Sequence, residues 1–129
     1  MEKNLLSEAD KEKFHVYIKK WQVNLGLIDW RFGFSKKMAS GMADMKSNLG
    51  ARLATYRLGD WKGNPINDFE LEKTACHEVL HTLLHEFAQS IRTDASAEVQ
   101  ESAEHRVVNT LEGLLVPQPV SKTNLRNPE

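Results

Sequence analysis

The stretch at residues 74–87, TACHEVLHTLLHEF, constrains the fold more than any other part of the sequence. A helix turns about 100° per residue, so residues four apart lie on nearly the same face. Apolar residues recur at this spacing and predict a long amphipathic helix. Its expected buried arc consists of Phe69, Cys76, Leu80, Leu83, Leu84, Phe87 and Ile91. His77 and His81 are four apart at the edge of that arc, where the core would meet a cleft.

The remaining sequence predicts an α+β domain around this helix. Ser7 is a suitable N-cap for a helix over residues 8–25, and Leu25-Gly26-Leu27 would end it. Strands are expected at residues 30–35, 43–46 and 51–58. The long helix should begin at Asn67 or Asp68 and reach Arg92, and a last helix should cover residues 97–115. Among the 129 residues, one domain is expected over 1–117 and a polar tail over 118–129.

Composition narrows the classes of partner and compartment. The net charge is −1, which gives no global basic field for nucleic acid or an acidic membrane. Cys76 is the single cysteine, so an intrachain disulfide is impossible. The amino-terminal residues are too charged for a signal peptide, and no apolar run reaches the length of a membrane span. These features predict a cytoplasmic protein without membrane or nucleic-acid partners.

The histidine pair predicts a metal site. Two imidazoles one helical turn apart can bind one tetrahedral ion. Glu78 lies about 100° from His77, further out than the histidines, so it can stay off the metal and act on water. His85 continues the spacing, but it lies about 12 Å along the axis from His77, too far to share the ion. It is expected to be a surface histidine or an outer partner of the ligands.

A third ligand must come from the helix at residues 97–115. The apolar arc of this helix is expected to contain Val107, Val108, Leu111, Leu114 and Leu115. Glu104 falls within this arc, and an inward carboxylate is costly unless it is paired or binds a metal. Glu101 lies at the margin of the arc and His105 lies beyond it. Glu104 is therefore the preferred third ligand, with Glu101 as the alternative.

These residues resemble the gluzincin metallopeptidases, in which HExxH supplies two ligands and a glutamate on a later helix supplies the third. The order of elements is similar to the minimal zincin core of ImmA/IrrE-like peptidases and of small phage-encoded HExxH proteins. In the former, the later helix reads approximately E-x-x-A-N-x-F-A-x-x-L-L-x-P. Residues 104–117, EHRVVNTLEGLLVP, match its glutamate, Leu-Leu and proline. The resemblance covers about residues 8–117.

The resemblance implies a zinc-dependent peptidase of peptide or protein substrates. His77, His81 and Glu104 would bind Zn²⁺, and Glu78 would be the general base. The substrate would pair with a sheet edge, most readily residues 51–58. Tyr56 and His105 are candidates for stabilising the oxyanion, and a protein partner could complete the shallow cleft. The alternative function is a zinc-stabilised regulatory or binding module of phage or mobile-element type, with little or no proteolysis.

Overall fold

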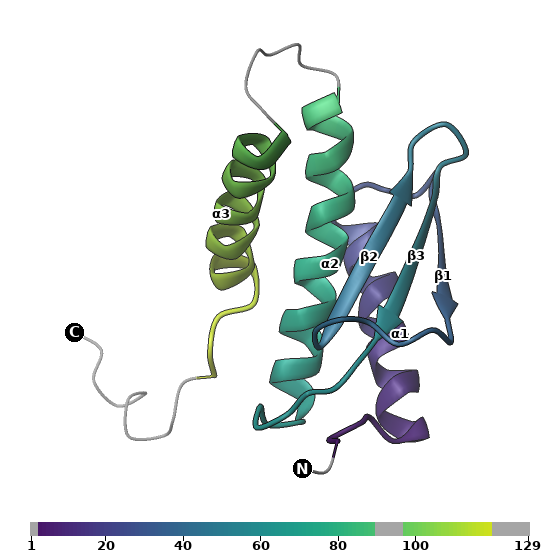
Figure 1. Cartoon of the computed structure of the whole chain (residues 1–129), viewed down its shortest axis with the longest axis vertical. Coiled ribbons are helices and arrows are strands. Elements are labelled where there is room, and N and C mark those ends of the chain that lie inside the picture. Colours follow the sequence, from purple (N-terminus) through teal and green to yellow (C-terminus); the bar gives the residue numbers. More distant parts are fainter. Residues whose placement is uncertain (1–2, 90–96, 120–129) are drawn as a thin grey trace, which may run out of the picture.

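A computed structural model describes residues 3–89 and 97–119. The chain forms one helix, a three-stranded sheet and two further helices, which confirms the expected α+β class (Figure 1). The elements are α1 (Glu8–Asn24), β1 (Arg31–Ser35), β2 (Ala43–Asn48), β3 (Leu53–Leu58), α2 (Asp68–Gln89) and α3 (Ala97–Leu115). Residues 90–92 of the expected long helix, the connection at 93–96 and residues 120–129 of the expected tail lie outside the described residues.

Side-chain caps begin the first two helices. The Ser7 hydroxyl accepts a hydrogen bond from the Asp10 backbone N–H at 3.1 Å. The Asn67 side-chain oxygen accepts one from the Glu70 N–H at 2.8 Å, so Asn67 rather than Asp68 caps α2. Gly26 follows the end of α1 with a φ of 76°, a left-handed conformation that favours glycine.

The strand order is β1-β3-β2, so β3 is the central strand. β1 is parallel to β3, and β2 is antiparallel to it. The expectation that residues 51–58 form the sheet edge is therefore wrong, and β2 and β1 are the edges. The strand also begins later than expected, because Ala51 and Arg52 belong to the preceding turn and Arg52 has a φ of 52°.

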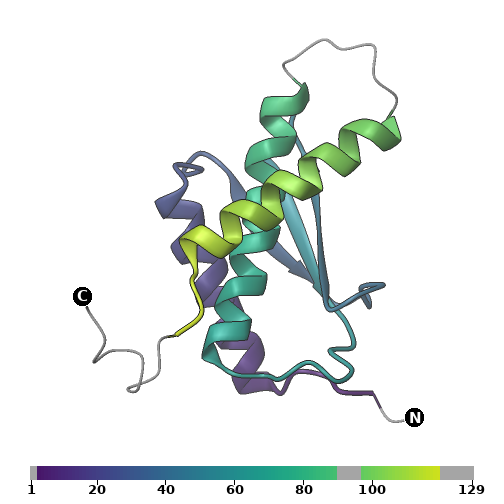
Figure 2. The same ribbon diagram turned by 90° about the vertical axis from the view of Figure 1, so that its left-hand side faces the viewer.

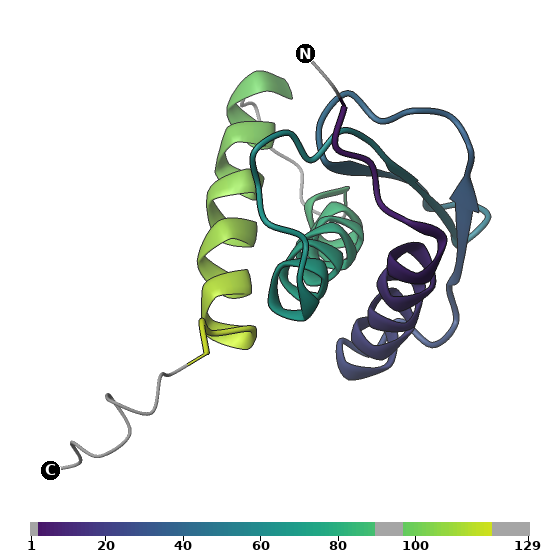
Figure 3. The ribbon, with the colours of Figure 1, turned by 90° about the horizontal axis from the view of Figure 1, so that it is seen from below.

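The helices α1 and α2 pack on one face of the sheet, and α3 packs against the outer side of α2 (Figures 2 and 3). The core lies between the sheet and the first two helices. Its buried side chains include Trp21, Trp30 and Trp61, as the sequence predicts. Among the described residues, no helix is long and apolar enough to cross a membrane.

Several expected core residues are instead exposed. Phe87 is 62% exposed near the end of α2. On α3, Val107, Leu114 and Leu115 are also exposed, whereas Val108 is fully buried. Because the described part of α3 packs mainly against α2, only a narrow stripe of it is covered. The broad apolar arc expected for this helix is therefore wrong.

Candidate metal centre

The helix α2 presents different side chains to its three neighbours. Leu71, Ala75, Val79 and Leu80 are fully buried in the core. On the side facing β2, the Thr82 hydroxyl lies 2.8 Å from the Ser47 hydroxyl. Glu78 is one turn before Thr82 and is only 6% exposed. The expectation that Glu78 lies further out than the histidines is therefore wrong, because β2 covers this side of the helix.

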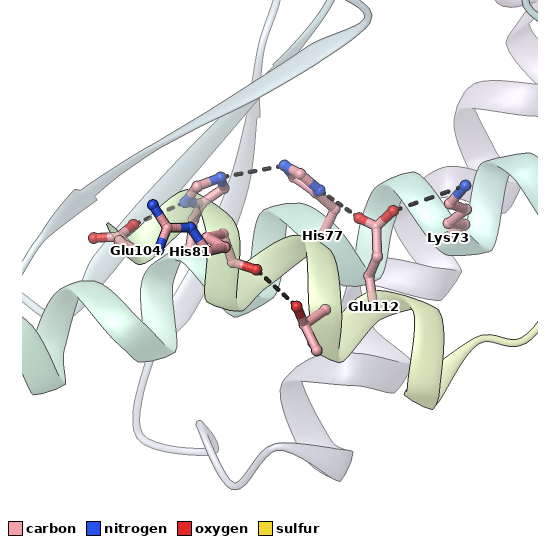
Figure 4. Close-up of polar contacts among 7 residues, drawn as sticks. Lys73, His77, His81, Glu104 and Glu112 are labelled. Carbon is pink, nitrogen blue, oxygen red and sulfur yellow. Dashed lines mark hydrogen bonds and ion pairs between the residues drawn. The ribbon is translucent and has the colours of Figure 1, made fainter. Parts of the chain in front are cut away.

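The face of α2 toward α3 carries the two histidines, each held by a carboxylate of α3 (Figure 4). Nδ1 of His81 lies 2.8 Å from Oε2 of Glu104. Nδ1 of His77 is hydrogen-bonded to Oε1 of Glu112, and Lys73 lies 3.8 Å from the other oxygen of Glu112. An ionised carboxylate only accepts hydrogen bonds, so both histidines donate through Nδ1–H. In the neutral rings, both Nε2 atoms then carry lone pairs.

The two Nε2 atoms face each other at 3.2 Å. Two lone pairs at this distance repel each other unless a proton or a cation lies between them. Zinc–nitrogen bonds of about 2.0–2.1 Å in a tetrahedral site place two ligand nitrogens about 3.3 Å apart. Metal-binding histidines also commonly donate their second N–H to a carboxylate. The spacing and the hydrogen bonds of this pair therefore fit a metal ion.

His105 of α3 completes a group of three histidines that could bind a metal ion. Its ligand nitrogen and those of His77 and His81 all lie within 4.8 Å of one another. Its ring is stacked on that of His81, with centroids 5.3 Å apart. A tetrahedral site would require His105 to approach by up to about 1.5 Å.

The predicted third ligands occupy different places. Glu104 contacts the Nδ1 edge of His81, away from the facing Nε2 atoms. Its side chain is 18% exposed, as expected for an inward residue, whereas Glu101 is exposed. His85 is half-buried and lines the adjacent cleft, outside the three-histidine group. The assignment of Glu104 as a ligand stays a prediction.

Burial changes the proton affinity of two groups at the site. It raises the pKa of Glu78 to about 8, with further contributions from the negative charges of Asp44 and Glu112. Burial also lowers the pKa of His81, although its hydrogen bond to Glu104 opposes this shift. His81 is therefore biased toward the neutral form, which is the form that binds metals.

A cleft of about 1260 Å³ opens beside the histidines. It lies between β2 on one side and α3 on the other, and Glu78, His77 and His81 line it. Tyr56 is 2% exposed and hydrogen-bonded to His15 at 2.7 Å. It is a core residue and does not line this cleft, so it is not placed to act there.

Comparison with protein-family models, curated proteins and solved structures finds no match for this chain. The interpretation of the site therefore depends on its geometry.

Sequence reasoning missed two members of this cluster. His105 is exposed on α3, as expected for a residue beyond the buried arc, yet its ring contacts those of His77 and His81. Glu112, on the same helix, is absent from the ligand set expected from the sequence. It lies two turns after Glu104, hence on the same face. The sequence therefore contained a signal for these contacts. It has two histidines on one helix and two glutamates at about twice that spacing on the next, antiparallel helix.

Proposed function

We propose that this chain is a zinc-dependent metallopeptidase. The observation that carries the proposal is the pair of Nε2 atoms 3.2 Å apart, with both Nδ1 atoms held by carboxylates. His77 and His81 would bind the zinc, and His105 is the third ligand that this arrangement favours. Glu104 and Glu112 would then orient the first two ligands and increase their basicity.

Bound zinc supplies a Lewis acid that polarises a carbonyl and lowers the pKa of water. Glu78 lies one residue from His77 and lines the same cleft, which supports a role in taking a proton from the attacking water. Its pKa of about 8 in the metal-free protein keeps it mostly protonated at neutral pH, and the positive charge of a bound zinc would favour the carboxylate that accepts the proton. After attack, the same carboxyl group would return the proton to the leaving amine.

The substrate would be an extended peptide paired with β2. This strand is a sheet edge, and its residues 43–47 line the cleft. An edge strand offers unpaired backbone groups to a peptide, which can add to the sheet as a further strand. Pairing with β2 would bring a peptide bond beside the histidines, whereas the central strand β3 offers no such edge.

Metal content tests the first part of this proposal. Protein purified without a tag should contain about one zinc per chain, and His77→Ala should abolish binding. His105→Ala and Glu104→Ala, measured side by side, identify the third ligand. A large loss in His105→Ala with a smaller loss in Glu104→Ala supports the three-histidine site. The reverse result would support Glu104 as the ligand, and absence of zinc after reconstitution would refute the site.

Cleavage of a peptide library tests the second part. The zinc-loaded wild type should cleave, and Glu78→Gln should retain zinc but lose activity. A second candidate function is a zinc-stabilised binding module. It is favoured by one observation: Tyr56, a candidate for stabilising the oxyanion, is buried in the core. Stoichiometric zinc without cleavage of any peptide would support the module.

A further inference from the structure

The strand region and the helices α2 and α3 carry opposite charges, which the net charge of −1 conceals. Residues 31–58, which contain all three strands, have six lysines and arginines and a single acidic residue, Asp44. The helices α2 and α3 together have nine acidic residues against two basic ones. The largest excess of positive charge therefore lies in the strand region, since α1 has four lysines against three acidic residues.

One face of the sheet is left open. Phe32, Ala54, Tyr56 and Leu58 point toward the helices and are buried. Side chains alternate along a strand, so their neighbours point away from the helices. In Figure 3, the described helices all lie on one side of the sheet, and none of them covers the other. The alternate residues include Arg31, Gly33, Asp44, Lys46, Thr55 and Arg57, of which Asp44 and Lys46 on the edge strand also line the cleft beside α3.

The cations of this face are exposed and mostly unpaired. Arg57 is held by Asp44. Arg31 and Lys46 are exposed and form no ion pair with another described residue. Lys36 and Lys37 follow the end of β1, and they are also exposed and form no ion pair with another described residue. Gly33 and Thr55 lie between Arg31 and Lys46, so the side chains at the centre of the face are small and uncharged. Arg31 and Lys46 on the strands, with Lys36 and Lys37 just beyond β1, form a cationic surface that complements a polyanion.

We propose that this open face binds the phosphate backbone of a double-stranded nucleic acid without reading its sequence. Among the described residues, the face has no aromatic side chain on which unpaired bases could stack, which disfavours a single strand. Its one large apolar residue among the described strands, Leu53, is 37% exposed at one end of the central strand, and membrane surfaces usually bind a broader apolar face. No helix projects from it to enter a groove, so contacts would be made to phosphates. The proposal departs from the expectation drawn from net charge, and it does not depend on zinc.

Fluorescence anisotropy with a labelled DNA duplex of about 20 base pairs tests the proposal by its salt dependence. Non-specific binding has dissociation constants of about 10⁻⁴–10⁻⁶ M at physiological salt, and log K falls by about 0.9 per log unit of salt for each phosphate neutralised. Four unpaired cations give an expected slope of about −3 to −4. The double variant Arg31→Gln, Lys46→Gln should bind more weakly and reduce the slope by about 2.

A matched control removes two cations elsewhere. Lys3→Gln with Lys19→Gln gives the same change in net charge at exposed positions, and this variant should bind almost as the wild type does. Thermal melting should show that both double variants remain folded. Addition of a zinc chelator should not change duplex binding, which separates this proposal from the peptidase.

Three results would overturn the proposal. One is the absence of duplex binding by the wild type at low salt. Another is an equal loss of binding in the control variant, since the sheet face would then have no special role. The third is binding to phosphatidylserine vesicles but not to the duplex, which would make the face a membrane surface.

Discussion

Replacing Glu78 with glutamine should remove most of the pH dependence of stability of the metal-free protein near neutral pH. The pKa of Glu78 is raised from 4.5 to about 8 in the folded protein, chiefly by burial. Between these values the folded state holds a proton that the unfolded state has released. The stability that this proton provides is fully present below pH 4.5 and is lost as the pH rises through about 8.

The size of the effect follows from the two pKa values. Each unit of difference corresponds to about 1.4 kcal/mol. Between pH 5 and pH 8, the wild type should lose about 3 to 4 kcal/mol of unfolding free energy through this group. Glutamine has nearly the same shape and does not titrate, so Glu78→Gln should lack this loss. At pH 8 the variant should therefore be the more stable protein.

Urea unfolding followed by tryptophan fluorescence measures this difference, because the three tryptophans lie in the core. A chelator keeps metal ions away from the site throughout. Glu12→Gln, at an exposed position of α1, is the control and should follow the wild type. If the wild type and Glu78→Gln lose stability in parallel from pH 5 to pH 8, Glu78 does not titrate in this range and the reasoning fails.

Three further predictions concern the outer partners of the site, the core and alkaline pH. Glu112→Gln should weaken zinc binding by about 10- to 100-fold, measured by competition with a chromophoric chelator; an unchanged affinity would show that the contact with His77 is incidental. Leu80→Ala should cost about 2–5 kcal/mol of unfolding free energy, because Leu80 is fully buried; a smaller loss in urea unfolding would mean that its surroundings collapse. Burial raises the pKa values of Tyr56 and Cys76 to about 12. The two groups therefore contribute to the unfolding free energy at neutral pH, and this contribution disappears as the pH rises from about 9 to 12. Tyr56→Phe should reduce this alkaline loss, and identical pH profiles for the variant and the wild type would contradict the assignment.

Local sequence patterns were sufficient to predict the elements. The caps, the helical spacing of apolar residues and Gly26 depend on neighbouring residues, and they located all three helices. The bounds of α3 agree with the expected 97–115. The order of the strands could not be obtained in this way, because pairing joins residues distant in sequence. That order placed β2 rather than β3 at the edge beside α2.

The site was predictable to the extent that it lies on a single helix. His77 and His81 required only the four-residue spacing. The burial of Glu78 depends on β2, and the carboxylate that each histidine contacts depends on how α3 lies against α2. A helical wheel for α3 gives its faces but not the width of the covered stripe. Val107 and Leu114 are therefore exposed, and His105 contacts the two histidines of α2 from outside the buried stripe.

The narrow contact of α3 has a consequence for the dynamics of the molecule. Val108 is its one fully buried residue among those whose side chains are described, so little apolar surface holds this helix in place. Segments with little apolar burial open at a lower free energy than the core around them. Amide hydrogens of α3 should accordingly exchange with solvent faster than those of α2 in the metal-free protein. A metal ion bound by His105 and the two histidines of α2 would cross-link the two helices. It would slow amide exchange in α3 and leave the exchange rates of the sheet unchanged.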